Sequence, residues 1–326
     1  MLENLDKVIQ TTEIVRNQVE GEARFGRAYY HFMLLTQYCL WNENAPGIGY
    51  REGVNPDEIP ERRTVGYTIS RIYEDLSLAE DCLKKAGRTQ FDFASNTRPT
   101  IPTVQAFRAR VDLYRGNYES ALKNANAALD AHGELVDLNT DPYYMTMEMP
   151  NSLMLMQEDG SMTVKSTIML PMLMNTPGRS FLEYRELFLP NVSTTMMCGS
   201  WIPVSESFSE LWDRNTDLRW QKFYNIHYYY LMMSPIMGYG IVPWASGQYL
   251  RELDFHTYCR FYSYGAYAGQ IVGMTTAEMY LIKAECMART GGVESDVVNV
   301  LKTLRRTRFS DTNVADNVGG TVQNVL

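Results

Sequence analysis

The sequence predicts a mostly α-helical protein in which stacked helical hairpins form a scaffold for an irregular, loop-rich subdomain. Apolar residues recur every three or four positions in several segments before residue 133 and again after residue 273, which is typical of helices with one buried face. Short turns that contain glycine join these segments in pairs. From about 134 to 272 the helical periodicity fades and proline becomes frequent.

Composition limits the function classes. The chain has 326 residues, 45% of them hydrophobic, so a sizeable core is expected. A net charge of −8 and a pI near 5.2 argue against a nucleic-acid partner, because phosphate binding needs a basic face. No apolar stretch of about 18 residues occurs, so no segment is expected to span a bilayer. The five scattered cysteines form no CxxC pair and are expected to be free structural thiols.

The first two predicted helices lie on either side of a long loop. The stripe of the first comprises Phe25, Ala28, Tyr29, Phe32, Leu35 and Cys39, and that of the second comprises Ile69, Ile72, Tyr73, Leu76, Ala79 and Leu83. Thr64 is the expected N-cap of the second helix and Gly87 its expected end. Residues 42–63 are rich in glycine, proline, asparagine and charge, and loops this long inside a compact domain tend to be functional.

Two later segments read as helical hairpins. Residues 102–133 contain two apolar stripes around the turn Gly116-Asn117, and this unit looks like a tetratricopeptide (TPR) repeat. The pattern returns at 275–309, where a helix closed by Gly291-Gly292 precedes a second helix. Since one hairpin cannot bury its stripe alone, several must stack. We expect a TPR-like scaffold at approximately 1–133 and 273–309 within a single domain, 1–326.

The middle of the chain has an unusual composition. Eleven of the chain's nineteen methionines lie between residues 145 and 197, and prolines such as Pro150 and Pro171 interrupt any helical pattern. We expect irregular loops, short helices and a hairpin or two. From Phe223 to Tyr267, fourteen of 45 residues are aromatic, an excess beyond ordinary core filling. The region at approximately 134–272 is therefore predicted to bind a ligand.

Five segments in this order resemble the SusD/RagB family. The first helix carries Glu22, Ala23, Arg24, Arg27, Ala28, Tyr29, Tyr30 and Phe32, and the second carries Tyr73, Asp75, Leu76 and Ala79. The others are VQAFRARVDLYRGNYESAL (104–122), IPVSESFSELWDRNTDLRW (202–220), and AEMYLIKAECMARTGG with LRRTR (277–308). The Asp217 and Arg219 pair within the fourth segment is expected to be a structural ion pair or a helix cap.

The resemblance implies a non-catalytic lipoprotein at the cell surface of Bacteroidetes. Such a protein captures oligosaccharides for import by a SusC-like TonB-dependent transporter of the outer membrane. It would be lipid-anchored in its full-length form. Residues 1–10 do not read as a signal peptide, and no lipid-bearing cysteine is apparent. The family's usual segment after the last arginine pair is also missing, so we expect the chain to be a fragment or a truncated gene product.

No catalytic or metal-binding pattern stands out. The four histidines are far apart, and neither HExxH nor GxSxG occurs. The stretches GIGY (47–50) and GYG (238–240) lack the strand and helix that a phosphate-binding loop needs. We therefore expect no enzymatic activity, no metal and no cofactor.

The predicted ligand site rests on aromatic rings beside amides. Rings can lie against the face of a sugar while amides reach its hydroxyl edge. In the resembled family, ligands generally meet loops, and the loop after the first long helix commonly contributes. The expected ligand-binding residues are Trp41, Asn42, Asn44, Tyr229, Trp244, Tyr249 and Tyr264.

Two alternatives stay open. The same transporter system could take up a peptide or another nutrient, which would favour pockets for side chains. A TPR-like protein-interaction scaffold would need no sugar site at all. Trp212 and Trp220 are assigned to core packing in either case.

Overall fold

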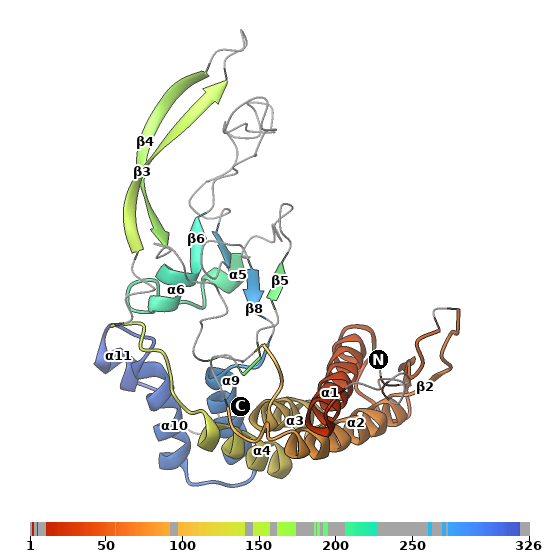
Figure 1. Ribbon diagram of the computed structural model, residues 1–326. Coiled ribbons are helices and arrows are strands. Elements are labelled where there is room, and N and C mark those ends of the chain that lie inside the picture. The colour runs from red at the N-terminus through yellow and green to blue at the C-terminus, as the bar shows by residue number, and fades with distance from the viewer. Residues whose placement is uncertain are drawn as a thin grey trace.

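Long helices form the predicted scaffold, and Figure 1 shows them arranged in an arc. They are α1 (Glu13–Tyr38), α2 (Val65–Lys85), α3 (Ile101–Arg115), α4 (Tyr118–Ala131), α9 (Thr276–Arg289) and α10 (Glu294–Arg306), with the short α11 (Thr312–Asp316) at the end. The computed structural model describes residues 2, 5, 11–55, 57–91, 97–140, 146–156, 162–173, 186, 188–189, 192–194, 206–226, 260–262, 269–271 and 273–319. None of the helices in these ranges is long and apolar enough to cross a membrane.

The helices stack in pairs. Helix α1 packs on α2, α3 on α4, α4 on α9, and α9 on α10. The last repeat of the chain therefore continues the stack that the first helices begin, although more than 140 residues separate α4 from α9. The predicted fold class, mostly α with TPR-like stacked hairpins, is confirmed.

The turns between the helices follow local sequence chemistry. The Thr64 hydroxyl accepts the amide of Tyr67 at 3.1 Å, as expected of an N-cap. Gly87, Gly116 and Gly291 follow α2, α3 and α9 and all have φ between 72° and 78°. This left-handed region is strained for residues with a Cβ, so glycine lets the chain turn sharply at each of these helix ends.

Phe107 is the centre of the scaffold core. It is fully buried on α3, and three rings of α1 surround it. Its centroid lies 5.6 Å from that of Phe25, 5.1 Å from that of Tyr29 and 5.4 Å from that of Phe32. The edge-on or tilted geometry of these pairs is the arrangement that aromatic rings favour. The stripe predicted for the first helix is therefore what joins α1 to the repeats.

The region between α4 and α9 contains strands. The longest pair is β3 (Thr146–Met156) with β4 (Met162–Leu173), an antiparallel hairpin that projects from the arc in Figure 1. The pairs β5 (Val192–Thr194) with β8 (Gly269–Ile271) and β6 (Tyr224–Ile226) with β7 (Arg260–Tyr262) are short. The short helices are α5 (Glu206–Ser209) and α6 (Leu218–Phe223). These elements match the expected short helices and hairpins.

Pro150 and Pro171 interrupt the helical pattern as predicted, but they lie within strands and not in irregular loops. Both prolines lie inside the long hairpin, where Pro150 is paired with Met169 and Pro171 with Glu148. A proline lacks the N–H that a sheet uses and is tolerated on an edge strand. In this two-stranded sheet each strand has an outer edge, so proline is compatible with both strands.

Asp217 and Arg219 play the structural role predicted for them. The Arg219 guanidinium donates to both carboxylate oxygens of Asp217, at 3.0 and 2.7 Å. The same carboxylate accepts the Arg219 backbone amide at 3.0 Å and so caps α6. Trp220 is buried, and its ring centroid lies 6.0 Å from that of Trp212, which agrees with their assignment to packing.

A buried ion pair joins the helical scaffold to the middle region. Arg308, just after α10, donates to the Glu186 carboxylate at 2.5 Å and to the Val136 carbonyl at 2.5 Å. The same carboxylate accepts the Val136 amide at 2.7 Å. Glu186 is fully buried and Arg308 nearly so. One arginine therefore links the end of the scaffold to two segments of the middle region, at Val136 and at Glu186.

Candidate functional site

The predicted aromatic residue Trp41 lies at the edge of the scaffold core. It follows the end of α1, is partly buried, and packs edge-on against Tyr114 of α3 with centroids 5.4 Å apart. Asn42 and Asn44 are exposed next to it. The structure brings these three residues together in one turn. Tyr229, Trp244, Tyr249 and Tyr264 lie outside the described residues, so their part in ligand binding stays a prediction.

The turn from Asn42 to Ala45 is held by the start of α2. The first amides of a helix have no partner within the helix. Here the amide of Val65 donates to the Ala45 carbonyl and that of Gly66 to the Glu43 carbonyl, both at 2.9 Å. Inside the turn, the Asn44 amide donates to the side chain of Asn42 at 3.0 Å. The turn beside Trp41 is therefore fixed by backbone contacts to a long helix.

A short hairpin extends this turn. Strand β1 (Pro46–Gly49) pairs antiparallel with β2 (Arg62–Thr64), which leads directly into α2. A Cβ atom on Gly47 would lie 2.8 Å from the Thr64 carbonyl oxygen. Contacts this short require the backbone to move, so glycine allows the two strands to approach. The Arg62 guanidinium also donates to the Gly47 carbonyl at 2.6 Å.

Gly47→Ala is expected to lower the free energy of unfolding by about 1–3 kcal/mol, because the new methyl group must displace backbone. Urea denaturation followed by circular dichroism measures this loss. Gly26→Ala is the matched control, since a Cβ at that half-buried position of α1 meets nothing within 4 Å. There alanine should stabilise the helix by about 0.5–1 kcal/mol. Equal stabilities for the two variants would contradict the close approach at Gly47.

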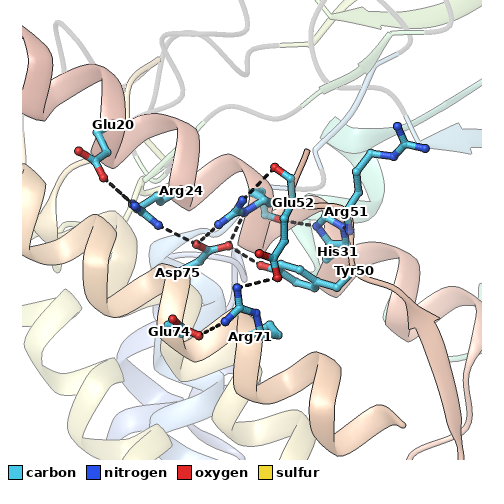
Figure 2. Close-up of polar contacts among 10 residues, drawn as sticks. Glu20, Arg24, His31, Tyr50, Arg51, Glu52, Arg71, Glu74 and Asp75 are labelled. Atoms are coloured by element: carbon cyan, nitrogen blue, oxygen red, sulfur yellow. Dashed lines mark hydrogen bonds and ion pairs between the residues drawn. The ribbon is translucent and has the colours of Figure 1, made fainter. Parts of the chain in front are cut away.

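The buried carboxylate of Asp75 anchors the loop to α1 and α2. Asp75 of α2 accepts two hydrogen bonds of 2.6 Å from the Arg27 guanidinium and one from the Tyr50 hydroxyl, and Arg24 lies 3.4 Å away. Figure 2 shows this cluster between α1, α2 and the loop. Burial would raise the pKa of Asp75, but the hydrogen bonds from Arg27 and Tyr50 outweigh burial and lower it. Burial, followed by the bond to Asp75, raises the pKa of Tyr50.

His31 of α1 forms a second anchor. Its ring stacks on Tyr50 with centroids 4.0 Å apart. Nδ1 lies 2.7 Å from the Arg27 carbonyl oxygen, and Nε2 accepts the backbone amide of Arg51 at 2.9 Å. Burial lowers the pKa of His31 below its ordinary value. The histidine is therefore held neutral beneath the loop.

The loop beyond Tyr50 has its own internal support. The Arg51 guanidinium donates to the carbonyls of Asn55 at 2.8 Å and Glu58 at 2.7 Å, and Arg71 of α2 pairs with Glu52 at 2.7 Å. An open pocket of about 240 Å³ lies on this segment; the residues that line it include Tyr50, Arg51, Glu52, Glu58, Arg63 and Tyr67. This polar pocket was not predicted. The only signal for it in the sequence was the length and composition of the loop at 42–63.

The arrangement of helices and loop corresponds to a class of protein in which a helical scaffold presents a binding loop. A stiff helical scaffold presents one long loop, whose backbone is fixed at both ends and whose surface carries an indole ring, amides and a polar pocket. Among the described residues, no cluster of three or more metal-ligating side chains occurs. Such a loop can bind a polar ligand through ring contacts and hydrogen bonds.

Comparison with known families agrees with this class. Residues 1–113 match the family model SusD-like_3, described as starch-binding associating with outer membrane. These residues contain α1, the loop and α2, which build most of the candidate site, and they end one residue before Tyr114 of α3. On this match residues 1–113, about a third of the 326-residue chain, are similar to this SusD-like family. Among proteins with curated functional descriptions, none matches the sequence.

Solved structures show that the fold extends beyond this segment. A SusD superfamily protein from Bacteroides thetaiotaomicron has a TM-score of 0.61 at 15% identity. The match covers 100% of this chain and 66% of the Bacteroides thetaiotaomicron chain. A SusD-like carbohydrate binding protein from Bacteroides vulgatus has a TM-score of 0.60 at 16% identity, with 100% and 61% covered. Surface glycan-binding protein A from Bacteroides uniformis has a TM-score of 0.54 at 15% identity, with 93% and 62% covered. The chain thus spans less than two thirds of the length of each.

Proposed function

We propose that the chain is a non-catalytic binding protein that captures oligosaccharides at the cell surface. The observation that carries the proposal is the Trp41 turn, in which a partly exposed indole and the exposed Asn42 and Asn44 are held by α2 and α3. The starch-binding description of the family supports a carbohydrate as the ligand. Residues 134–272 would supply the remaining rings, Tyr229, Trp244, Tyr249 and Tyr264.

The physical basis is complementarity between a sugar and a rigid rim. The face of a sugar ring carries C–H groups, and its edge carries hydroxyls. An indole supplies apolar area with little loss of conformational entropy, and amides donate to and accept from hydroxyls. Because Tyr114 fixes Trp41 before the ligand arrives, binding needs little ordering of the protein. No bond in the ligand is made or broken.

A protein partner fits the outer face of the scaffold. Tyr30, Leu34 and Tyr38 follow one another at intervals of four along α1 and are 63%, 45% and 71% exposed. A stripe of this kind offers the partly apolar contact that a stable protein interface needs. The proposed partner is a SusC-like TonB-dependent transporter of the outer membrane, and the full-length protein would be lipid-anchored beside it.

A second candidate is peptide capture by the same system. It is favoured by the pocket at the loop, whose lining includes Arg51 and Arg63 together with Glu52, Glu58 and Glu61. Side chains of both charge signs suit a zwitterionic ligand better than a neutral sugar. The two candidates differ in which part of the loop meets the ligand.

Native gel electrophoresis tests the proposal. The purified chain should be retarded in gels that contain soluble starch or another neutral polysaccharide, whereas serum albumin should not be. The polysaccharide should release no new reducing ends during incubation. Free mobility in every polysaccharide, combined with calorimetric binding of short peptides, would replace the first candidate with the second.

A further inference from the structure

His31 is held in one protonation state by its two partners. It is 9% exposed, at the contact between α1, α2 and the loop. The Arg27 carbonyl oxygen can only accept, so Nδ1 carries the hydrogen of that 2.7 Å bond. The Arg51 backbone amide can only donate, so Nε2 carries none in the 2.9 Å bond. Both bonds are satisfied together only in the neutral ring.

The bond to Nε2 anchors a whole segment. Arg51 directly follows Tyr50, where the chain leaves β1, and its guanidinium holds the carbonyls of Asn55 and Glu58. The described residues of the segment Tyr50–Glu58 (50–55, 57 and 58) are therefore tied to α1 through this backbone amide, through the stacking of Tyr50 on His31, and through a 3.4 Å bond from the Arg27 guanidinium to the Glu52 carbonyl. Residues of this segment line one side of the pocket. Loss of the bond would loosen this wall while leaving the Trp41 turn attached to α2.

The charged groups around His31 come from three elements. On its own helix, Arg27 lies near the ring but is paired with Asp75 of α2. The loop contributes Tyr50, Arg51 and Glu52, and Arg71 of α2 pairs with Glu52. Burial is the main cause that lowers the pKa of His31, and the positive charge of Arg27 adds to it. The bond to the Arg27 carbonyl and the charge of Asp75 act in the opposite direction without cancelling this shift.

We propose that protonation of His31 releases the Arg51 amide, so that the segment Tyr50–Glu58 loosens and the binding loop opens in mild acid. A proton on Nε2 would replace the acceptor of the Arg51 amide with a second donor, and two buried donors would face each other. In the released state, His31 is solvated and titrates near its ordinary value of 6.5. The effect on ligand capture rests on the proposed function; the opening itself does not.

The sign of the pH dependence follows from linkage. The released state binds the proton more readily than the closed state, so release is favoured as the pH falls below about 6.5. Its equilibrium constant rises by up to tenfold for each pH unit until the lowered pKa of the closed state is reached. Above about pH 6.5 the closed segment keeps its full stability.

Amide hydrogen exchange between pH 7.5 and 5 tests the proposal, with rates corrected for the intrinsic pH dependence of exchange. Protection of the Arg51 amide should fall by up to tenfold per pH unit below 6.5, while amides of α3 and α4 keep theirs. In His31→Gln the side-chain carbonyl can accept the Arg51 amide at every pH, so protection should not change. A fall that persists in His31→Gln, or no fall in the parent chain, would overturn the inference.

A second measurement needs no variant. Long-range proton–nitrogen correlation spectra should show His31 with its hydrogen on Nδ1 at neutral pH, and a hydrogen on Nε2 would overturn the proposal. These measurements also distinguish failure of this inference from failure of the proposed function. If the chain bound no polysaccharide at any pH, the acid-dependent exchange at Arg51 would still be observed.

Discussion

Arg308→Met is expected to lower the free energy of unfolding by about 3–5 kcal/mol, the usual effect of leaving one partner of a buried ion pair without its counter-charge. The fully buried Glu186 would lose the guanidinium that donates to it at 2.5 Å. The Val136 carbonyl would lose its 2.5 Å donor in the same change. Methionine fills much of the arginine volume, so the loss is mainly electrostatic. Urea denaturation at neutral pH measures it.

The matched control separates charge from volume. Adding Glu186→Gln to Arg308→Met removes the buried negative charge but keeps an oxygen for the Val136 amide, which donates to Glu186 at 2.7 Å. The double variant should recover a large part of the lost stability. If Arg308→Met unfolds at the urea concentration of the parent chain, the ion pair does not join the scaffold to the middle region as described.

Asp75→Asn is also expected to lower the free energy of unfolding by about 3–5 kcal/mol. Asp75 is buried, and its two oxygens accept two bonds of 2.6 Å from Arg27 as well as the Tyr50 hydroxyl. An amide has one oxygen, so one Arg27 donor would face a second donor. The contact between α1 and α2 should weaken, and the segment Tyr50–Glu58 should be held less tightly as well. Hydrogen exchange at Arg51 and urea denaturation together measure both effects.

The pH dependence of this loss has a definite sign. The native pKa of Asp75 lies below its ordinary value of 3.8, so the carboxylate stabilises the fold above that pH. The stability difference between Asp75→Asn and the parent chain should be complete above about pH 4 and shrink as the pH falls through the lowered pKa. Glu74→Gln is the control, because Glu74 is about half exposed and exposed pairs contribute less than about 1 kcal/mol. Equal losses for the two variants would contradict the role given to Asp75.

The scaffold could be predicted because its signals are local. The apolar spacing of Phe25, Phe32 and Leu35 belongs to one helix, and the turns at Gly116 and Gly291 need a residue that tolerates positive φ. Each of these properties depends on residues within a few positions of one another. The sequence pattern therefore predicted the helices, their turns and their pairing.

The candidate site could be predicted only in part, because its contacts are distant in the sequence. Trp41 was predicted from the composition of its loop, but its fixation by Tyr114 depends on packing against another helix. The grouping of Arg27, Tyr50 and Asp75 joins three elements, and sequence spacing does not indicate which charges meet. The long hairpin was obscured by Pro150 and Pro171, since proline signals a break unless the strand is known to be an edge.

Calorimetric titration with the polysaccharide that retards the chain most strongly tests the central claim, which is that a scaffold-held ring at the start of the loop binds a sugar. Trp41→Ala should weaken binding by about tenfold or more, close to 1.4 kcal/mol, while Trp41→Phe keeps most of the affinity because a ring remains. Circular dichroism should show both variants folded. Unchanged affinity in folded Trp41→Ala would contradict the account.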